Sequence, residues 1–170
     1  NGKKVTVVIE LQARFDEEAN IYWSNLLQEE GANVINGIPG LKIHSKLLWV
    51  KRTEGGKLQH YAFVGTGNFN ESTARIYADE GLLTAHPDIA EEVANIFEFF
   101  KHNYKHFEFR NLLVSPFNMK PQFIKMINRE IKCARKGKLA WMILKMNSLI
   151  DPEMMVKIYE ASQAGVQVKL

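Results

Sequence analysis

The sequence has a single cysteine, Cys133, among its 170 residues. One thiol excludes an internal disulfide framework and a zinc site built from several cysteines, so the reducing cytoplasm is the expected setting. No apolar run approaches the roughly 18 residues of a membrane span, and the start shows no signal-peptide pattern. We therefore expect a cytoplasmic protein, with membrane association left open. The chain starts at Asn1 and stops inside an apolar run, which we interpret as a segment of a longer protein.

Apolar and charged residues are plentiful by contrast. Hydrophobic residues make up 46% of the chain, and ten Phe, five Tyr and three Trp are among them. This composition supplies a real core and excludes a wholly disordered chain. The net charge of +3 hides a segregation, because residues 101–138 carry ten Lys or Arg against Glu108 and Glu130. A basic block is typical of a polyanion partner such as nucleic acid, phospholipid or a phosphate polymer; the alternative is a solvated helix face.

Strand and helix signals alternate along the chain. Strands are predicted from apolar and β-branched runs, and helices from amphipathic stripes with capping residues at their ends. The predicted strands are 5–11, 32–35, 42–51, 60–65, 112–114, 139–145 and 166–170. The predicted helices lie between Asp16 and Gly31, from Pro87 to Phe100, from Pro121 to Lys136, and from Asp151 onward. Such alternation predicts an α/β fold, a mixed sheet flanked by helices.

One internal similarity suggests a two-fold repeat. A shift of 135 residues lays residues 7–16 over residues 142–151, and both segments read as a strand, a polar turn and an Asp-capped helix. Both helices are then followed by glycine and a short strand. We accordingly expect two domains, a complete one at 1–105 and the start of a second, truncated one at 106–170.

The most reactive grouping surrounds His44. In a strand, alternation would place Lys42, His44 and Lys46 on one face. Two neighbouring ammonium groups favour the neutral, nucleophilic imidazole, and they would also receive an incoming phosphate. An imidazole nitrogen can attack phosphorus and hold it as a phosphoramidate. The alternative is a solvated cationic strand face.

A glycine-rich turn, Gly65-Thr-Gly-Asn-Phe-Asn70, follows the next predicted strand. Its glycines allow backbone N–H groups to approach an anion, while Asn68 and Asn70 supply amide donors and Thr66 a hydroxyl. Alone this is an ordinary turn. Beside a His-x-Lys strand it predicts a phosphate site.

These two motifs carry a resemblance. His44-Ser-Lys46 with Gly65-Thr-Gly-Asn68 resembles the half-site of the phospholipase D superfamily, and the chain as a whole resembles the bacterial polyphosphate kinases that work through a phosphohistidine. The matching blocks are Val7–Asn20, Pro39–Lys46, Gly65–Glu71, Thr73–Tyr77, Leu113–Asn118 and Lys145–Asp151. The resemblance implies a phospholipase D-like fold and reversible transfer of the ATP γ-phosphate to polyphosphate.

The resemblance also implies roles for individual residues. His44 matches the phosphorylated histidine, Tyr77 a tyrosine that contacts the nucleotide, and Arg14 an arginine of the magnesium–phosphate site. A guanidinium has no lone pair for a cation, so Arg14 is expected to bind phosphate oxygens rather than Mg²⁺. Lys46 and Asn70 are expected, with Asn68 and Thr66, to stabilise the transferring phosphoryl group.

The implied partners are ATP or ADP and inorganic polyphosphate, with Mg²⁺ as cofactor, no DNA, and a homo-oligomeric full-length protein. We expect this chain to be inactive alone, because the second histidine of the family is missing from it. Two alternatives stay open. One is a phospholipase D-type phosphodiesterase, against which stands Lys51 at the position where that superfamily has Asp. The other is a non-catalytic module that binds polyanions through the basic block.

Overall fold

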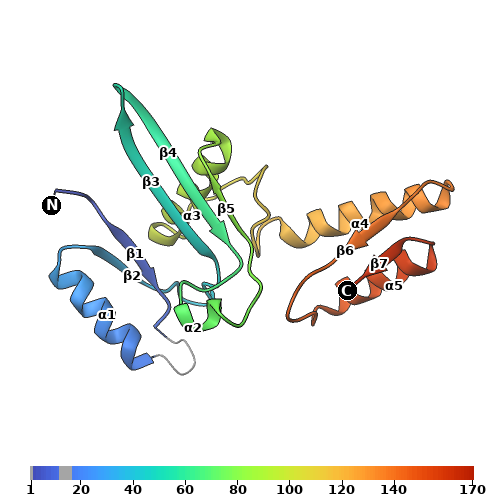
Figure 1. Cartoon of the computed structure of the whole chain (residues 1–170), viewed down its shortest axis with the longest axis horizontal. Coiled ribbons are helices and arrows are strands. Elements are labelled where there is room, and N and C mark those ends of the chain that lie inside the picture. Colours follow the sequence, from blue (N-terminus) through green and yellow to red (C-terminus); the bar gives the residue numbers. More distant parts are fainter. Residues whose placement is uncertain (1, 12–16) are drawn as a thin grey trace. The chain divides into compact units, whose positions relative to one another are not determined.

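The structure is a computed structural model that describes residues 2–11 and 17–170. Its contacts divide the chain into two compact units, Asn1–Asn111 and Leu112–Leu170 (Figure 1). The first unit contains β1 (Thr6–Ile9), α1 (Glu17–Glu29), β2 (Asn33–Asn36), β3 (Lys46–Glu54), β4 (Lys57–Gly65), α2 (Glu71–Ala74), β5 (Gly81–Thr84) and α3 (Pro87–Lys101). The second contains α4 (Met119–Arg135), β6 (Trp141–Ile143), α5 (Pro152–Gln163) and β7 (Gln167–Lys169).

The first unit begins with a parallel β–α–β motif. Strands β1 and β2 pair in parallel from Thr6↔Asn33 to Ile9↔Asn36, with α1 as the crossover between them. Gly31 follows α1 with a φ of 83°, a left-handed conformation that glycine adopts without a Cβ penalty. The chain can therefore turn back directly into β2.

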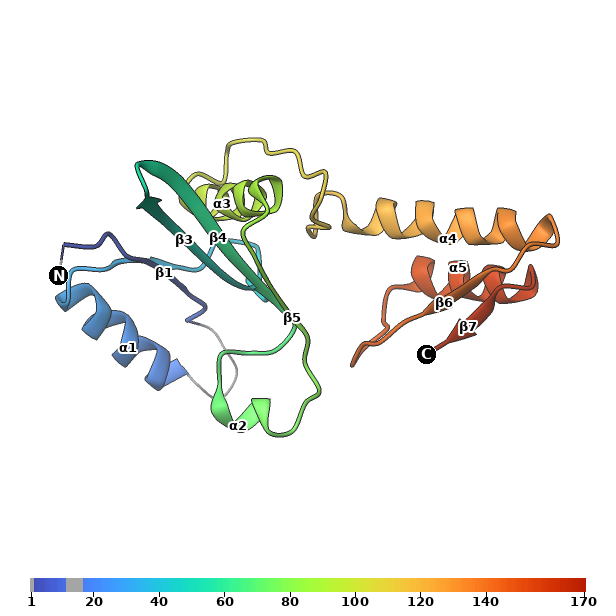
Figure 2. The ribbon, with the colours of Figure 1, turned by 45° about the horizontal axis from the view of Figure 1, so that its top comes forward.

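An antiparallel sheet of three strands, ordered β3-β4-β5, forms the rest of this unit. Gly55 and Gly56 join β3 to β4 with φ values of 55° and 77°, and a two-residue hairpin turn of this kind needs both to be positive. Helix α3 packs on β3 and β4 (Figure 2). Its buried residues include Ala90 and Val93, and Ala62 of β4 is also fully buried. The register pairs Lys46 with Gly65, which brings together the ends of the two predicted motifs.

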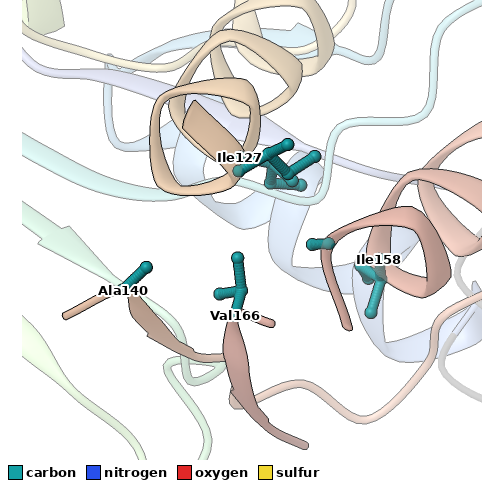
Figure 3. Close-up of a cluster of buried hydrophobic side chains, with 6 residues drawn as sticks. Ile127, Ala140, Ile158 and Val166 are labelled. Carbon is teal, nitrogen blue, oxygen red and sulfur yellow. The ribbon is translucent and has the colours of Figure 1, made fainter. Parts of the chain in front are cut away.

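The second unit repeats the β–α–β motif. Strands β6 and β7 pair in parallel from Trp141↔Gln167 to Ile143↔Lys169, with α5 between them. The structure thus confirms that both halves share the motif that the repeat predicts. Side chains from α4, from α5 and from the residues just before β6 and β7 form the core of this unit, and Figure 3 labels four of them. The core residues are Ile127, Ile131, Ala140, Ile158, Ala161 and Val166.

The mixed α/β class is confirmed, but several predicted boundaries are wrong. The strand predicted at 42–51 begins only at Lys46, so no strand alternation places Lys42 and His44 on one face. The strand predicted at 112–114 is irregular, because the Asn118 side chain takes the backbone groups that a ladder would use. Its Oδ1 accepts from the Val114 N–H at 2.7 Å, and its Nδ2 donates to the Leu112 carbonyl at 3.0 Å. The short β5 and α2 were not predicted.

The division between the units falls after Asn111, six residues beyond the domain end that the sequence predicts at residue 105. Glu92 of α3 explains the difference. This carboxylate is 7% exposed and accepts hydrogen bonds from the backbone N–H groups of Arg110 at 2.8 Å and Asn111 at 3.0 Å. The segment that follows α3 is therefore tied to the first unit.

Candidate active site

His44 lies immediately before β3, two residues from the buried Lys46. The Nζ of Lys46 is 3.1 Å from Nδ1 and 3.2 Å from Nε2 of His44, and it donates a hydrogen bond to the His44 carbonyl at 2.6 Å. Because the two ring nitrogens are almost equally distant, the ammonium is not aligned with the lone pair of either one. The imidazole itself is exposed, so an incoming group can reach it.

The surroundings of His44 favour its neutral form. Partial burial lowers the pKa of His44 below its ordinary 6.5, and the charges of Lys46 and Lys42 lower it further. The direction agrees with the expectation from sequence, while the largest cause, burial, is a property of the fold. Burial also lowers the pKa of Lys46, and Lys42 adds to this effect while Asp79 opposes it. A neutral imidazole keeps a lone pair available at neutral pH, as a nucleophile requires.

Glu10, which the sequence analysis missed, holds the segment before His44. Its Oε2 accepts a hydrogen bond from the Ile43 N–H at 3.0 Å, and its carbonyl accepts from Nδ2 of Asn20 at 3.0 Å. Glu10 directly follows β1, so the end of the parallel motif anchors the residue next to the histidine. The sequence feature that could have identified Glu10 is an acidic residue at the end of an apolar strand.

The turn after β4 is held by Asp79 and Glu80. Thr66 donates its hydroxyl hydrogen to Oδ1 of Asp79 at 3.0 Å, and its Oγ1 accepts from the Glu80 N–H at 3.0 Å. The Thr66 N–H donates to the Glu80 carbonyl at 3.0 Å. A contact from the Thr66 hydroxyl to phosphate stays a prediction, and it requires exchange of the Asp79 bond because a hydroxyl has one hydrogen to donate.

Gly67 is required by packing rather than by its backbone angles. A Cβ at this position would overlap the carboxylate of Asp79 and would also lie 2.9 Å from its Cβ. Asp79 therefore fixes the turn twice, by its bond to Thr66 and by its close approach to Gly67.

Asn70 caps the short helix α2. Its Oδ1 accepts from the Thr73 N–H at 3.0 Å, and its own N–H donates to the Asn68 carbonyl at 2.8 Å. The side-chain NH₂ of Asn70 keeps its two hydrogens for an anion, since a cap uses only the oxygen. Asn68 is exposed on the same turn.

Among the described residues, Tyr77 is the remaining predicted site residue, and no contact joins it to His44. Tyr77 follows α2 and is 59% exposed, with its N–H donated to the Thr73 carbonyl at 3.1 Å. Arg14 lies outside the described residues. Within residues 2–11 and 17–170, no three His, Cys, Asp or Glu side chains form a group that would hold a metal ion.

Three comparisons with known proteins find similar sequences and a similar structure. The sequence matches the family descriptions "Polyphosphate kinase C-terminal domain 1" over residues 1–106 and "Polyphosphate kinase C-terminal domain 2" over residues 112–170. It is 52% identical to the polyphosphate kinase of Vibrio parahaemolyticus and 50% identical to that of Escherichia coli K12, over all 170 residues. The chain spans only 24% and 25% of the length of these two relatives.

A solved structure is similar as well. The crystal structure of polyphosphate kinase from Porphyromonas gingivalis matches 98% of this chain and 28% of its own, with a TM-score of 0.83 and 41% sequence identity. This match confirms the expected phospholipase D-like α/β fold. None of the helices described between residues 17 and 170 is both long and apolar enough to cross a bilayer.

Proposed function

Because the chain belongs to the polyphosphate kinase family, we propose that it carries the histidine of an ATP:polyphosphate phosphotransferase, with His44 as the phosphorylated residue. The observation that carries this proposal is the exposed imidazole whose pKa is lowered by burial and by two lysines. In a solvated cationic loop with no phosphate site nearby, an exposed imidazole with a lowered pKa would have no function. Beside a turn that carries the side-chain amides of Asn68 and Asn70, such an imidazole suits attack on a phosphate.

The reaction has two in-line transfers. A ring nitrogen of His44 attacks the γ-phosphorus of ATP, so that a P–N bond forms while the bond from phosphorus to the bridging oxygen breaks, and ADP leaves with that electron pair. A terminal oxygen of polyphosphate then attacks the same phosphorus, forms a P–O bond and breaks the P–N bond. The imidazole returns to its neutral state, and the polymer is one phosphate longer.

The negative charge on the oxygens of the transferred phosphoryl group is stabilised by hydrogen-bond donors that are already in place. Lys46 lies next to the imidazole, and the amides of Asn68 and Asn70 supply neutral donors on the neighbouring turn. Tyr77 and Arg14 enter the proposal through the family resemblance, for the nucleotide and its phosphates. Mg²⁺ is proposed to arrive bound to nucleotide phosphates, where it neutralises charge.

The phosphodiesterase alternative has less support. Lys51, at the position of the superfamily aspartate, is exposed on β3 opposite His60 of β4. A lysine there cannot act as the acid that this position supplies elsewhere in the superfamily.

The test uses the complete gene product that contains this chain, incubated with γ-labelled ATP and Mg²⁺. We expect a label on the protein that is acid-labile and base-stable, is lost in His44→Ala, and moves into an acid-insoluble polymer. His106→Ala is the matched control, since His106 is an exposed histidine of the same unit. Equal labelling of wild type and His44→Ala would overturn the assignment.

A further inference from the structure

The outer face of α4 carries a row of cations. Lys125, Arg129, Lys132 and the C-cap residue Lys136 follow one another at spacings of four, three and four residues, so they share one helix face. All four are exposed, while the buried Ile127 and Ile131 lie on the face toward the core of the second unit. The row extends about 16 Å along the helix at 1.5 Å per residue.

Three other cations of the basic block have acidic partners. Lys120, at the start of α4, contacts Oδ2 of Asp151 at 2.9 Å and Oε2 of Glu153 at 2.8 Å. Lys101 pairs with Glu98, and Arg110 lies 3.8 Å from Glu108. Of the seven remaining cations, four form the row on the outer face of α4, and Lys105, Arg135 and Lys138 are not part of it.

Few acidic side chains in the described part of the chain offset the positive charge of the row. Arg129 pairs with the adjacent Glu130 at 3.1 Å, but in the described part of the chain no acidic side chain pairs with Lys125, Lys132 or Lys136. Like charges three and four residues apart destabilise a helix. The helix dipole offsets this repulsion only in the last turn, which leaves Lys125 and Arg129 without that benefit.

A linear polyanion compensates such a row, because it places negative charges at regular intervals along the helix. We propose that the exposed α4 row, Lys125, Arg129, Lys132 and Lys136, is a binding surface for the polyphosphate chain, separate from the residues that transfer phosphate. The polymer's identity rests on the proposed function, since a phosphate polymer is what that reaction extends.

The test measures polyphosphate binding by the complete gene product and by a variant with Lys125→Gln, Lys132→Gln and Lys136→Gln. Glutamine keeps the helix propensity and removes the charge. The matched control removes three exposed lysines of the first unit, Lys3, Lys4 and Lys57, in the same way. A third variant replaces the three α4 lysines by arginine.

We expect the α4 glutamine variant to bind long polyphosphate at least tenfold more weakly at low salt. The slope of log affinity against log salt should fall by about 2, at about 0.7 per lost contact. The control and the arginine variant should stay within twofold of wild type. An unchanged affinity, an equal loss in the control, or tighter binding of a single-stranded oligonucleotide than of polyphosphate would overturn the inference.

Labelling by ATP alone separates the two proposals. It needs no polymer, so the α4 glutamine variant should label on His44 as wild type does. If wild type fails to label while the row still binds polyphosphate, the proposed function falls and the surface stands. If labelling is normal and the row makes no difference to binding, only the surface falls.

Discussion

Oε2 of Glu10 accepts the N–H of Ile43 at 3.0 Å, across 33 residues of sequence. This bond ties the end of a parallel β–α–β motif to the residue beside the candidate nucleophile. The position of His44 therefore depends on both parts of the first unit, the parallel pair and the antiparallel sheet.

Replacing Glu10 tests that dependence. Glu10→Ala removes the acceptor and leaves the Ile43 N–H unpaired, which we expect to weaken the anchoring by about 1 kcal/mol. Phosphorylation of His44 should slow about five- to tenfold, with little change in the apparent affinity for ATP. Glu10→Gln keeps an oxygen acceptor and should recover most of the rate. Equal loss in both variants would mean that the charge, not the anchoring bond, matters.

Replacing Lys42 tests the electrostatics of the histidine. The charge of Lys42 lowers the pKa of His44, so Lys42→Gln should raise this pKa. The nucleophile is the neutral imidazole, and its supply falls as the pH drops through the pKa. The acid limb of the pH profile for labelling should therefore move to higher pH. Lys57→Gln, at the far end of the β3–β4 hairpin, is the control and should leave the profile in place.

Replacing Gly67 tests the packing of the turn against Asp79. In Gly67→Ala the new Cβ overlaps Asp79, so the carboxylate must rotate and give up its bond to Thr66. We expect a destabilisation of about 1–3 kcal/mol and a loss of labelling. The double variant Gly67→Ala, Asp79→Ala removes the overlap with the carboxylate and leaves only the 2.9 Å approach of the two Cβ atoms, so it should be more stable than Gly67→Ala. A double variant that is less stable would contradict this account.

Replacing Glu92 tests what holds the segment after α3 to the first unit. Glu92→Ala leaves the N–H groups of Arg110 and Asn111 without their carboxylate partner, at an expected cost of about 1–3 kcal/mol in the free energy of unfolding. Glu92→Gln should fall between wild type and Glu92→Ala. Chemical denaturation and cleavage by trypsin after Arg110 would both report the loosening. Unchanged cleavage in Glu92→Ala would show that another contact holds this segment.

Features set by neighbours in sequence could be predicted well. Asp151 caps α5 through its bond from the Met154 N–H at 3.0 Å, and Gly165 follows that helix with a φ of 94°. The hairpin at Gly55-Gly56 and the amphipathic α4 also follow from local patterns. Each depends on a preference expressed within a few residues.

Features that depend on distant partners could not. The bond from Glu10 to Ile43 and the bond from Thr66 to Asp79 join segments whose proximity only the fold creates. Asn118 overrode an apolar strand pattern because its side chain competed for backbone groups. The histidine motif was recognisable from sequence, whereas the groups that hold it in place were not.

The duplicated β–α–β motif has a consequence for how such a protein diverges. The shift of 135 residues that superposes the two copies lays Glu10 on Lys145, an acid on a base. The copies share a backbone plan, yet the residue that anchors the His44 segment in one has the opposite charge in the other. Once a duplicated scaffold differs at such a position, the two halves are no longer interchangeable, and each is free to acquire a separate task.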